Sequence, residues 1–441
     1  MSDHGAVPAS RELGFWMCTA LVIGNTIGMG IFLLPASLAP YGLNALIGWG
    51  ITVTGMTVLA RVFARLARIF PDADGPYAYL RSTLGEWPAF GALWCYWICC
   101  WMTNAALAVG VVGYLQAVAP ALGTLPPAVP AVAALWFFVV LNLMGALAGG
   151  RVQVVTTALK LLPMAAVILL GAWLLIADPG TYTQHVPATP VTLGALMAAS
   201  TLSVYAMTGV ESAAVPASRV RDAARVIPRA TMVGTLLTAG IYVAVSAVAI
   251  MLIPQDELAA STAPFADLLD RYLHAGSGRW LAVFVVVSGL GALNGWTLLV
   301  GELTRTMATH GMLPRSLAAQ NRRGAPVAGL LATAVLATAM VLMSYSGNQS
   351  LVQGFTFLTL VVTAANMPLY MFCALALAVA WRRGLRTPRD LLVLGVLGSA
   401  YTIFALAGMG HEPFLWAVAL GLAGLPFYAV LRRRAKAAAS A

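Results

Sequence analysis

Twelve apolar segments, each long enough to cross a lipid bilayer, run through the chain. They cover residues 14–39, 43–67, 88–118, 128–148, 153–177, 192–216, 229–253, 280–304, 325–345, 352–381, 391–409 and 413–431. An α-helix needs roughly 17 to 25 such residues to span the hydrocarbon core. Only 9% of the residues are charged, compared with about 25% in soluble domains. We therefore expect an all-α polytopic membrane protein that uses residues 1–441 as one transmembrane domain.

Arginine is spread unevenly over the loops, and this predicts the orientation of the chain. One set of alternate loops, with the tail, contains Arg65, Arg68, Arg81, Arg151, Arg219, Arg221, Arg225, Arg229, Arg305, Arg315, Arg322, Arg323, Arg382, Arg383, Arg386, Arg389, Arg432, Arg433, Arg434 and Lys436. The opposite loops are mostly acidic, with Arg271 and Arg279 as exceptions. Because short cytoplasmic loops carry the Lys/Arg excess, we expect both termini to be cytoplasmic. Topology thus explains the net charge of +10 without a nucleic-acid partner.

Two of the twelve segments are interrupted in the middle. Residues 24–30 of the first segment read GNTIGMG, and residues 208–211 of the sixth read TGVE. Lipid offers no hydrogen-bond partner to free backbone groups, so an unwound stretch at this depth must be buried in protein or line a polar cavity. Paired interruptions of this kind indicate a transporter's substrate site between the two segments.

The positions of the interruptions suggest an internal repeat. If residues 14–177 and 192–381 form two five-helix repeats of inverted topology, each broken helix is the first of its repeat. Residues 391–431 then supply two additional helices. The five cysteines all fall inside predicted helices, and no histidine or carboxylate accompanies them, so we expect neither a disulfide framework nor a metal site.

Four motifs give the chain a resemblance to a known family. They are GNTIGMGIFLLPA at 24–36, GPYAY at 75–79, GVESA at 209–213 and GWTLL at 295–299. With these the chain resembles the amino acid, polyamine and organocation (APC) transporter superfamily. Within it, the sequence is most similar to the bacterial arginine/agmatine antiporters of the basic amino acid/polyamine antiporter group. The resemblance implies a leucine-transporter-type fold, alternating access and a place in the bacterial inner membrane.

The resemblance also implies which groups hold the two ends of an amino acid. The substrate carboxylate would meet free N–H groups of the first break, at Asn25, Thr26, Ile27, Gly28, Met29 and Gly30. Met29 stands where the family has a serine, so these donors are backbone groups or Thr26. The substrate ammonium would meet carbonyls of the sixth segment, at Ala206, Met207, Thr208 and Gly209. The alternative for both stretches is close helix packing by small residues.

Other expected site residues surround the rest of the substrate. Trp296 matches the aromatic residue on which the side chain of the substrate stacks, and Asn104 matches the residue that receives a guanidinium. Tyr96 and Cys100 share the helical face of Asn104. Tyr205 replaces a gating tryptophan. Phe357 and Leu358 stand where the family has serines near the substrate, and each of these aromatic and apolar residues could instead be ordinary core.

Three residues are candidates for gating or proton sensing. Tyr77 resembles an inner-gate tyrosine, although Tyr79 would serve equally well. Glu211 either caps the second half-helix or acts as the pH-sensitive group. Lys160 stands alone in the fifth segment, where arginine/agmatine antiporters are apolar and proton-coupled neutral amino acid transporters of the superfamily carry a lysine. We expect Lys160 to hold the carbonyls of the first break, and since burial disfavours an ammonium, to exchange a proton.

These observations predict a sodium-independent amino acid/polyamine transporter, most similar to arginine/agmatine exchangers. The alternative is a proton-coupled transporter of neutral amino acids that uses Lys160. A membrane-embedded enzyme or a sensor is a remote alternative, because the sequence contains no catalytic constellation. The expected partners are a small amino acid or amine and the lipid bilayer. No cofactor is expected, and a homodimer is compatible with the sequence.

Overall fold

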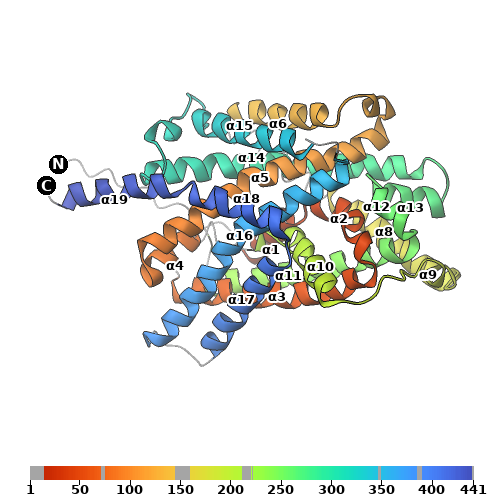
Figure 1. The fold of residues 1–441 in the computed structure, drawn as a ribbon, viewed down its shortest axis with the longest axis horizontal. Coiled ribbons are helices and arrows are strands. Elements are labelled where there is room, and N and C mark those ends of the chain that lie inside the picture. Colours follow the sequence, from red (N-terminus) through yellow and green to blue (C-terminus); the bar gives the residue numbers. More distant parts are fainter. Residues whose placement is uncertain are drawn as a thin grey trace.

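Every regular element in the described part of the chain is a helix (Figure 1). The computed structural model describes residues 14–70, 75–144, 159–210, 220, 222–345, 349–384 and 390–439. Eight helices are long and apolar enough to span a membrane within these ranges, and one bent pair forms a ninth candidate span. Three shorter apolar helices occupy the remaining predicted positions. The prediction of an all-α polytopic membrane protein is confirmed.

The helices follow the predicted segments closely. The first segment is the pair α1 (Phe15–Thr26) and α2 (Gly30–Leu38), and the last is the pair α18 (His411–Leu422) and α19 (Leu425–Ala439). The segments between them are α3 (Leu43–Ile69), α5 (Glu86–Val118), α6 (Ala128–Leu143), α8 (Leu161–Ala177), α10 (Leu193–Ala206), α11 (Ala223–Leu252), α14 (Ser277–Thr309), α15 (Val327–Ser344), α16 (Leu351–Arg382) and α17 (Asp390–Ala407). Shorter elements connect them: η1 (Ala39–Tyr41), α4 (Gly75–Leu84), η2 (Pro120–Thr124), α9 (Thr181–Gln184), α12 (Gln255–Ala260), α13 (Pro264–Tyr272) and η5 (Arg315–Ala318). The division into repeats at 14–177, 192–381 and 391–431 remains a prediction.

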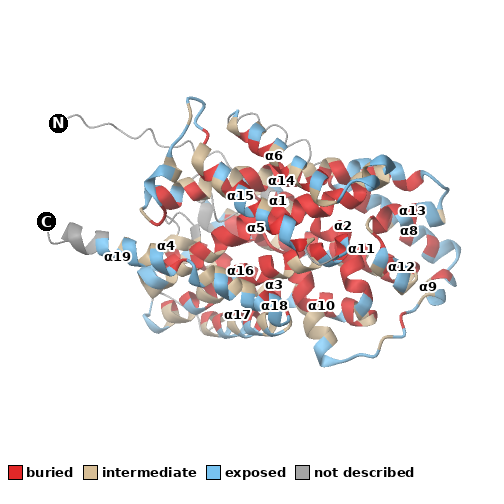
Figure 2. Ribbon diagram, turned by 45° about the horizontal axis from the view of Figure 1, so that its top comes forward, coloured by how far each residue is buried: buried red, intermediate tan, exposed pale blue. Residues whose placement is uncertain are grey.

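Helix α5 forms the centre of the bundle. It packs against α14, α16, α15 and α6, and 94% of its most apolar stretch is buried. Helices α6 and α15 pack together at one edge, whereas α18 and α19 lie on the outside (Figure 1). Figure 2 shows buried residues through the interior and exposed ones on the outer helices. Many of the exposed residues are large and apolar, such as Ile176 and Trp280, as a lipid-facing surface requires.

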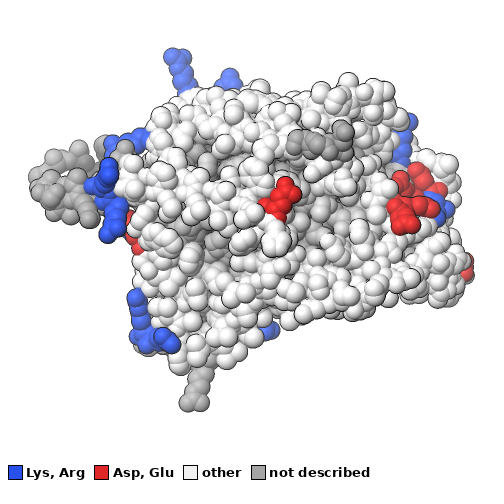
Figure 3. All heavy atoms as spheres, in the orientation of Figure 1, with Lys and Arg blue, Asp and Glu red and all other residues white. Residues whose placement is uncertain are grey.

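Charged residues separate toward the two ends of the molecule. Figure 3 shows basic side chains gathered at the end where α4 and α19 lie, and an acidic group at the opposite end, where α12 and α13 lie. This separation agrees with the loop pattern in the sequence. The cytoplasmic location of the basic end remains a prediction from that pattern.

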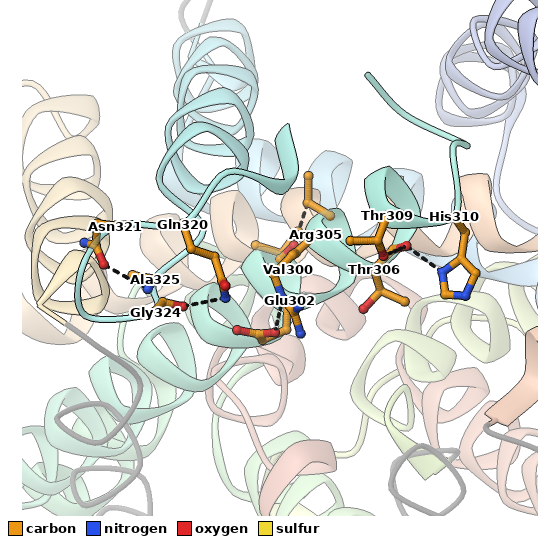
Figure 4. Close-up of polar contacts among 11 residues, drawn as sticks. Val300, Glu302, Arg305, Thr306, Thr309, His310, Gln320, Asn321, Gly324 and Ala325 are labelled. Atoms are coloured by element: carbon orange, nitrogen blue, oxygen red, sulfur yellow. Dashed lines mark hydrogen bonds and ion pairs between the residues drawn. The ribbon is translucent and has the colours of Figure 1, made fainter. Parts of the chain in front are cut away.

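The connection between α14 and α15 is held by its own hydrogen bonds (Figure 4). The His310 Nδ1 lies 2.8 Å from the carbonyl oxygen of Thr306 at the end of α14. Asn321 accepts from the backbone N–H of Ala325 at 3.0 Å and donates to the carbonyl of Leu143 at 2.8 Å. The second bond joins this loop to the end of α6, so the loop fixes α14, α15 and α6 relative to one another.

We expect the close approach of α5 to the loop after α12 to depend on Gly113. A Cβ atom at Gly113 would lie 2.1 Å from the backbone oxygen of Thr262, so Gly113→Ala must push the loop away at a cost of about 1–3 kcal/mol. A thermal unfolding assay on the purified protein should show a Tm lowered by a few degrees. Gly91→Ala on the same helix meets open space and should leave the Tm unchanged or higher. Equal Tm values for the two variants would contradict this packing.

Candidate functional site

The two interruptions predicted from the sequence lie against each other in the structure. Helix α1 ends at Thr26, α2 begins at Gly30, and the two helices are bent by 44°. Helix α10 ends at Ala206, and the turn after it reaches Gly209, whose φ is +105°. A Cβ atom at Gly209 would lie 3.1 Å from the carbonyl carbon of Asn25 and 3.3 Å from the Thr26 nitrogen. Only glycine combines this φ with so close an approach of backbone to backbone.

Two buried side chains satisfy carbonyl groups that the break in α1 leaves free. In a continuous helix the Gly24 and Thr26 oxygens would accept from the N–H groups four residues later. Here Lys160 Nζ donates to the Gly24 oxygen at 2.8 Å, and the Tyr242 hydroxyl donates to the Thr26 oxygen at 2.9 Å. Both side chains are almost completely buried. The predicted contact of Lys160 with the first break is therefore present in the structure.

A small cavity of about 10 Å³ lies between the two interruptions. Its lining consists of Asn25, Thr26, Gly28, Gly30, Thr103, Leu107, Tyr205, Ala206, Thr208 and Trp296. Eight of these were singled out in the sequence. Thr103 and Leu107 on α5 were missed, although they lie three and seven residues after Cys100 and therefore share its helical face. The cavity has room for about one water molecule, so an amino acid can enter only if the walls separate.

Tyr205 closes the cavity at the beginning of α2. A Cβ atom at Gly30 would lie 2.9 Å from Cε1 of Tyr205, so the ring rests directly on the glycine backbone. The same ring packs edge-on against Phe355 of α16, with centroids 6.0 Å apart. The first N–H groups of a helix carry partial positive charge and have no intrahelical carbonyl to which they can donate. Tyr205 thus covers the N-terminal end of α2.

Trp296 and Asn104 lie on neighbouring central helices, but only Trp296 lines the cavity. Asn104 on α5 is buried, and its Oδ1 accepts from the Thr297 hydroxyl on α14 at 3.3 Å. The Leu293 oxygen, at 2.7 Å, shares the single hydroxyl proton of Thr297 with Asn104. The amide of Asn104 therefore already joins α5 to α14, and receiving a guanidinium would compete with that contact.

Several predicted site residues lie outside this cavity. Met29 is fully buried and packs against Gly289 of α14, and Ile27 and Met207 are buried as well. None of Asn104, Gly209, Tyr96, Cys100, Phe357, Leu358 or Tyr77 belongs to the lining. Phe355 is the α16 residue in ring contact with Tyr205, and the alternation of aromatic residues at 355 and 357 gave no means of choosing between them. Glu211 lies outside the described residues. The roles assigned to these residues remain predictions.

An aromatic group connects α2 to the acidic end of the molecule. The Tyr114 hydroxyl on α5 donates to the Phe32 oxygen of α2 at 2.8 Å and accepts from the backbone N–H of Phe265 on α13 at 3.3 Å. The Phe32 ring lies edge-on to both Tyr114 and Phe265. Because α13 is attached in this way, a movement of α2 has to displace α13 or break these contacts.

The site contains no assembly of metal ligands. Within the described ranges, no group of three or more His, Cys, Asp or Glu side chains could hold a metal ion. The chemistry available among the described residues consists of backbone dipoles, the Asn25 amide, hydroxyl groups, one indole ring and the Lys160 amine.

Comparisons with known proteins agree with this geometry. The sequence model of the family described as amino acid permease matches residues 13–431. The chain is 31% identical over 430 residues to the cadaverine/lysine antiporter of Escherichia coli (strain K12), covering 96% of this chain and 95% of that protein. It is 27% identical over 423 residues to the putrescine transporter PotE of Haemophilus influenzae, covering 95% and 97%.

A solved structure shows a similar fold. The manganese transporter of Eremococcus coleocola superposes with a TM-score of 0.55 at 14% identity, covering 98% of this chain and 99% of that chain. At this identity the similarity concerns the fold alone.

We expect Lys160 and Tyr242 to stabilise the break in α1 by comparable amounts. Lys160→Met and Tyr242→Phe each leave one buried carbonyl oxygen without a partner, at a cost of about 1–3 kcal/mol. Thermal unfolding of the purified variants should show a lower Tm for both. Thr54→Val serves as the control, since the Thr54 hydroxyl donates to the Gly50 oxygen on the exposed face of α3. A Lys160→Met protein as stable as wild type would mean that the bond to Gly24 contributes nothing.

Proposed function

The chain belongs to the amino acid permease family, and from this premise we propose that it exchanges a basic amino acid for a polyamine by alternating access. The family consists of transporters, so the chain is a transporter and not an enzyme. The observation that most supports exchange of an amino acid is the contact of the two helix breaks at Gly209. The similarity to a cadaverine/lysine antiporter and a putrescine transporter over nearly the whole chain supports an amine as the second substrate.

The geometry supplies opposite partial charges for the two ends of an amino acid. The first turn of α2 at Gly30 presents the positive end of a half-helix, which suits a carboxylate. The last turn of α10 at Ala206 presents carbonyl oxygens, which suit an ammonium. Trp296 completes the cavity and would face the cationic side chain, an attraction of about 0.5–2 kcal/mol. An amine without a carboxylate would keep the last two interactions and lose the first.

The substrate pair that we propose first is lysine and a linear diamine. The cavity lining includes no carboxylate, so a second ammonium would be bound by the indole and by carbonyl oxygens. Exchange of arginine for agmatine is the second candidate, supported by the family resemblance that matches Asn104 to a residue that receives a guanidinium. The neutral amino acid alternative is not favoured, because these full-length relatives are named for amines.

Entry of either substrate requires Tyr205 and Gly30 to separate. The α1–α2 pair is the natural moving part, since its break is held by side chains from α11 and from the residue preceding α8. We further propose that both termini face the cytoplasm of a bacterial inner membrane, as the arginine-rich end of the molecule suggests.

Counterflow in proteoliposomes tests the proposed exchange. We expect uptake of radiolabelled lysine to be fast against internal cadaverine or putrescine, slower against agmatine, and absent with an empty interior. A panel of unlabelled competitors, including arginine and leucine, ranks the substrates. Competition by leucine with no effect of any amine would refute the proposal.

Two tryptophan variants test whether the transported substrate binds in the cavity. Trp296→Leu should raise the KM for lysine about 2- to 30-fold, which corresponds to a loss of about 0.5–2 kcal/mol. Trp173→Leu removes a largely exposed ring on α8 and should leave the KM unchanged. The cavity is not the substrate site if both variants behave alike.

The pH dependence of exchange distinguishes a protonation role of the Lys160 amine from the structural role of its hydrogen bond to Gly24. Lys160→Met and Tyr242→Phe each remove one bond to the break, but only Lys160→Met also removes an amine. We expect the pH profile of lysine exchange to change in Lys160→Met and to keep its shape in Tyr242→Phe. An unchanged profile in Lys160→Met would limit Lys160 to a structural role.

A further inference from the structure

A second and much larger hollow lies on the surface of the bundle, between α1, α3, α11 and α17. It has a volume of about 780 Å³ and shares no residue with the cavity at the helix breaks. Four arginines, Arg61, Arg65, Arg68 and Arg229, line it together with a single carboxylate, that of Asp390. We call this hollow the arginine crevice.

Among the described residues, the arginine crevice contains more positive than negative charge. Arg65 forms an ion pair with Asp390, whereas no salt bridge joins Arg61, Arg68 or Arg229 to any described residue. Arg61, Arg65 and Arg68 follow one another at spacings of four and three residues, so they share one face of α3. Three guanidinium groups in one hollow repel each other and attract an anion.

The position of Arg61 is the most informative detail. It lies seven residues, or about 10 Å of helix, from Arg68 toward the middle of α3, after the apolar run that ends at Ala60. The residue is exposed in a helix long and apolar enough to span the membrane. An exposed guanidinium at the edge of the hydrocarbon region is costly unless an anion accompanies it. A phosphate group at the depth of lipid headgroups would meet that need.

The remaining walls of the crevice are apolar. Val393 and Leu397 of α17 lie one turn apart, line the crevice and are about half exposed. Met232 of α11 forms part of the opposite wall. A soluble anion would gain nothing from these side chains, but a hydrocarbon chain below a phosphate would cover them. Arginine at one end and exposed aliphatic residues beside it match the two parts of a phospholipid.

We propose that the arginine crevice binds an anionic phospholipid, with its phosphodiester at Arg61, Arg68 and Arg229 and an acyl chain along Val393 and Leu397. Guanidinium groups bind phosphate oxygens in bidentate geometry, and basic hollows between membrane helices suit anionic headgroups. Phe15 at the beginning of α1 also lines the crevice. A bound lipid therefore touches the helix whose other end forms the break at Thr26.

Lipid binding to the purified full-length protein tests this assignment without any measurement of transport. Native mass spectrometry and thermal unfolding are carried out with phosphatidylglycerol, phosphatidylcholine or inorganic phosphate added to the detergent solution. We expect phosphatidylglycerol to bind and to raise the Tm, and the other two to do neither at equal concentration. The double variant Arg61→Gln/Arg229→Gln should bind phosphatidylglycerol at least tenfold more weakly.

The matched control is Arg322→Gln/Arg323→Gln, which removes the same charge from exposed positions outside the crevice and should bind like wild type. Protection by inorganic phosphate equal to that by phosphatidylglycerol would overturn the assignment to a lipid and indicate a soluble anion. Equal binding of phosphatidylcholine by the wild-type protein would overturn the role of charge, and this comparison does not depend on the variants folding.

Discussion

Inside a membrane every backbone N–H and C=O group needs a partner from the protein itself, and this constraint governs the structure around the break in α1. Where the chain unwinds between Thr26 and Gly30, the helix no longer supplies those partners. The side chains of Lys160 and Tyr242, which lie far from the break in the sequence, donate to two of the freed oxygens. The broken helix is therefore stable only when it packs against the segments that carry Lys160 and Tyr242. Any change in that packing affects the break.

Two glycines shape the site because they have no side chain. Gly209 lets one interruption touch the other, and Gly30 lets the Tyr205 ring rest on the beginning of α2. These contacts leave only a small cavity between the two breaks. In the proposed function, helix dipoles at this cavity would bind the part that all amino acids share, and Trp296 would contact the side chain. Closing and opening then need the displacement of one ring and one short helix.

Helix α1 joins the two sites of the molecule. One end lines the arginine crevice through Phe15, and the other end is the break that forms the cavity. At the acidic end, α2 continues to the contact with Tyr114 and Phe265. The pair α1–α2 thus contacts the arginine crevice, the cavity between the breaks, and α13. A movement of the pair would change all three contacts.

The sequence by itself determined the helical fold, the twelve segments, the two interruptions and the family, because hydropathy over some twenty residues and a cluster of glycine and polar residues in the middle of an apolar segment are local properties. It also pointed to Lys160, since a single cation in an apolar segment is unusual wherever the segment lies. Only the tertiary structure showed that Tyr242, like Lys160, donates to a carbonyl of the break. It also showed that Phe355 is in ring contact with Tyr205. Thr103 and Leu107 were found in the cavity lining in the same way. The same holds for the crevice formed by Arg61, Arg65, Arg68 and Arg229, since the sequence assigned Arg65, Arg68 and Arg229 to topology alone and did not single out Arg61. These are contacts between helices, and the rotation of each helix about its axis is set by packing against all the others.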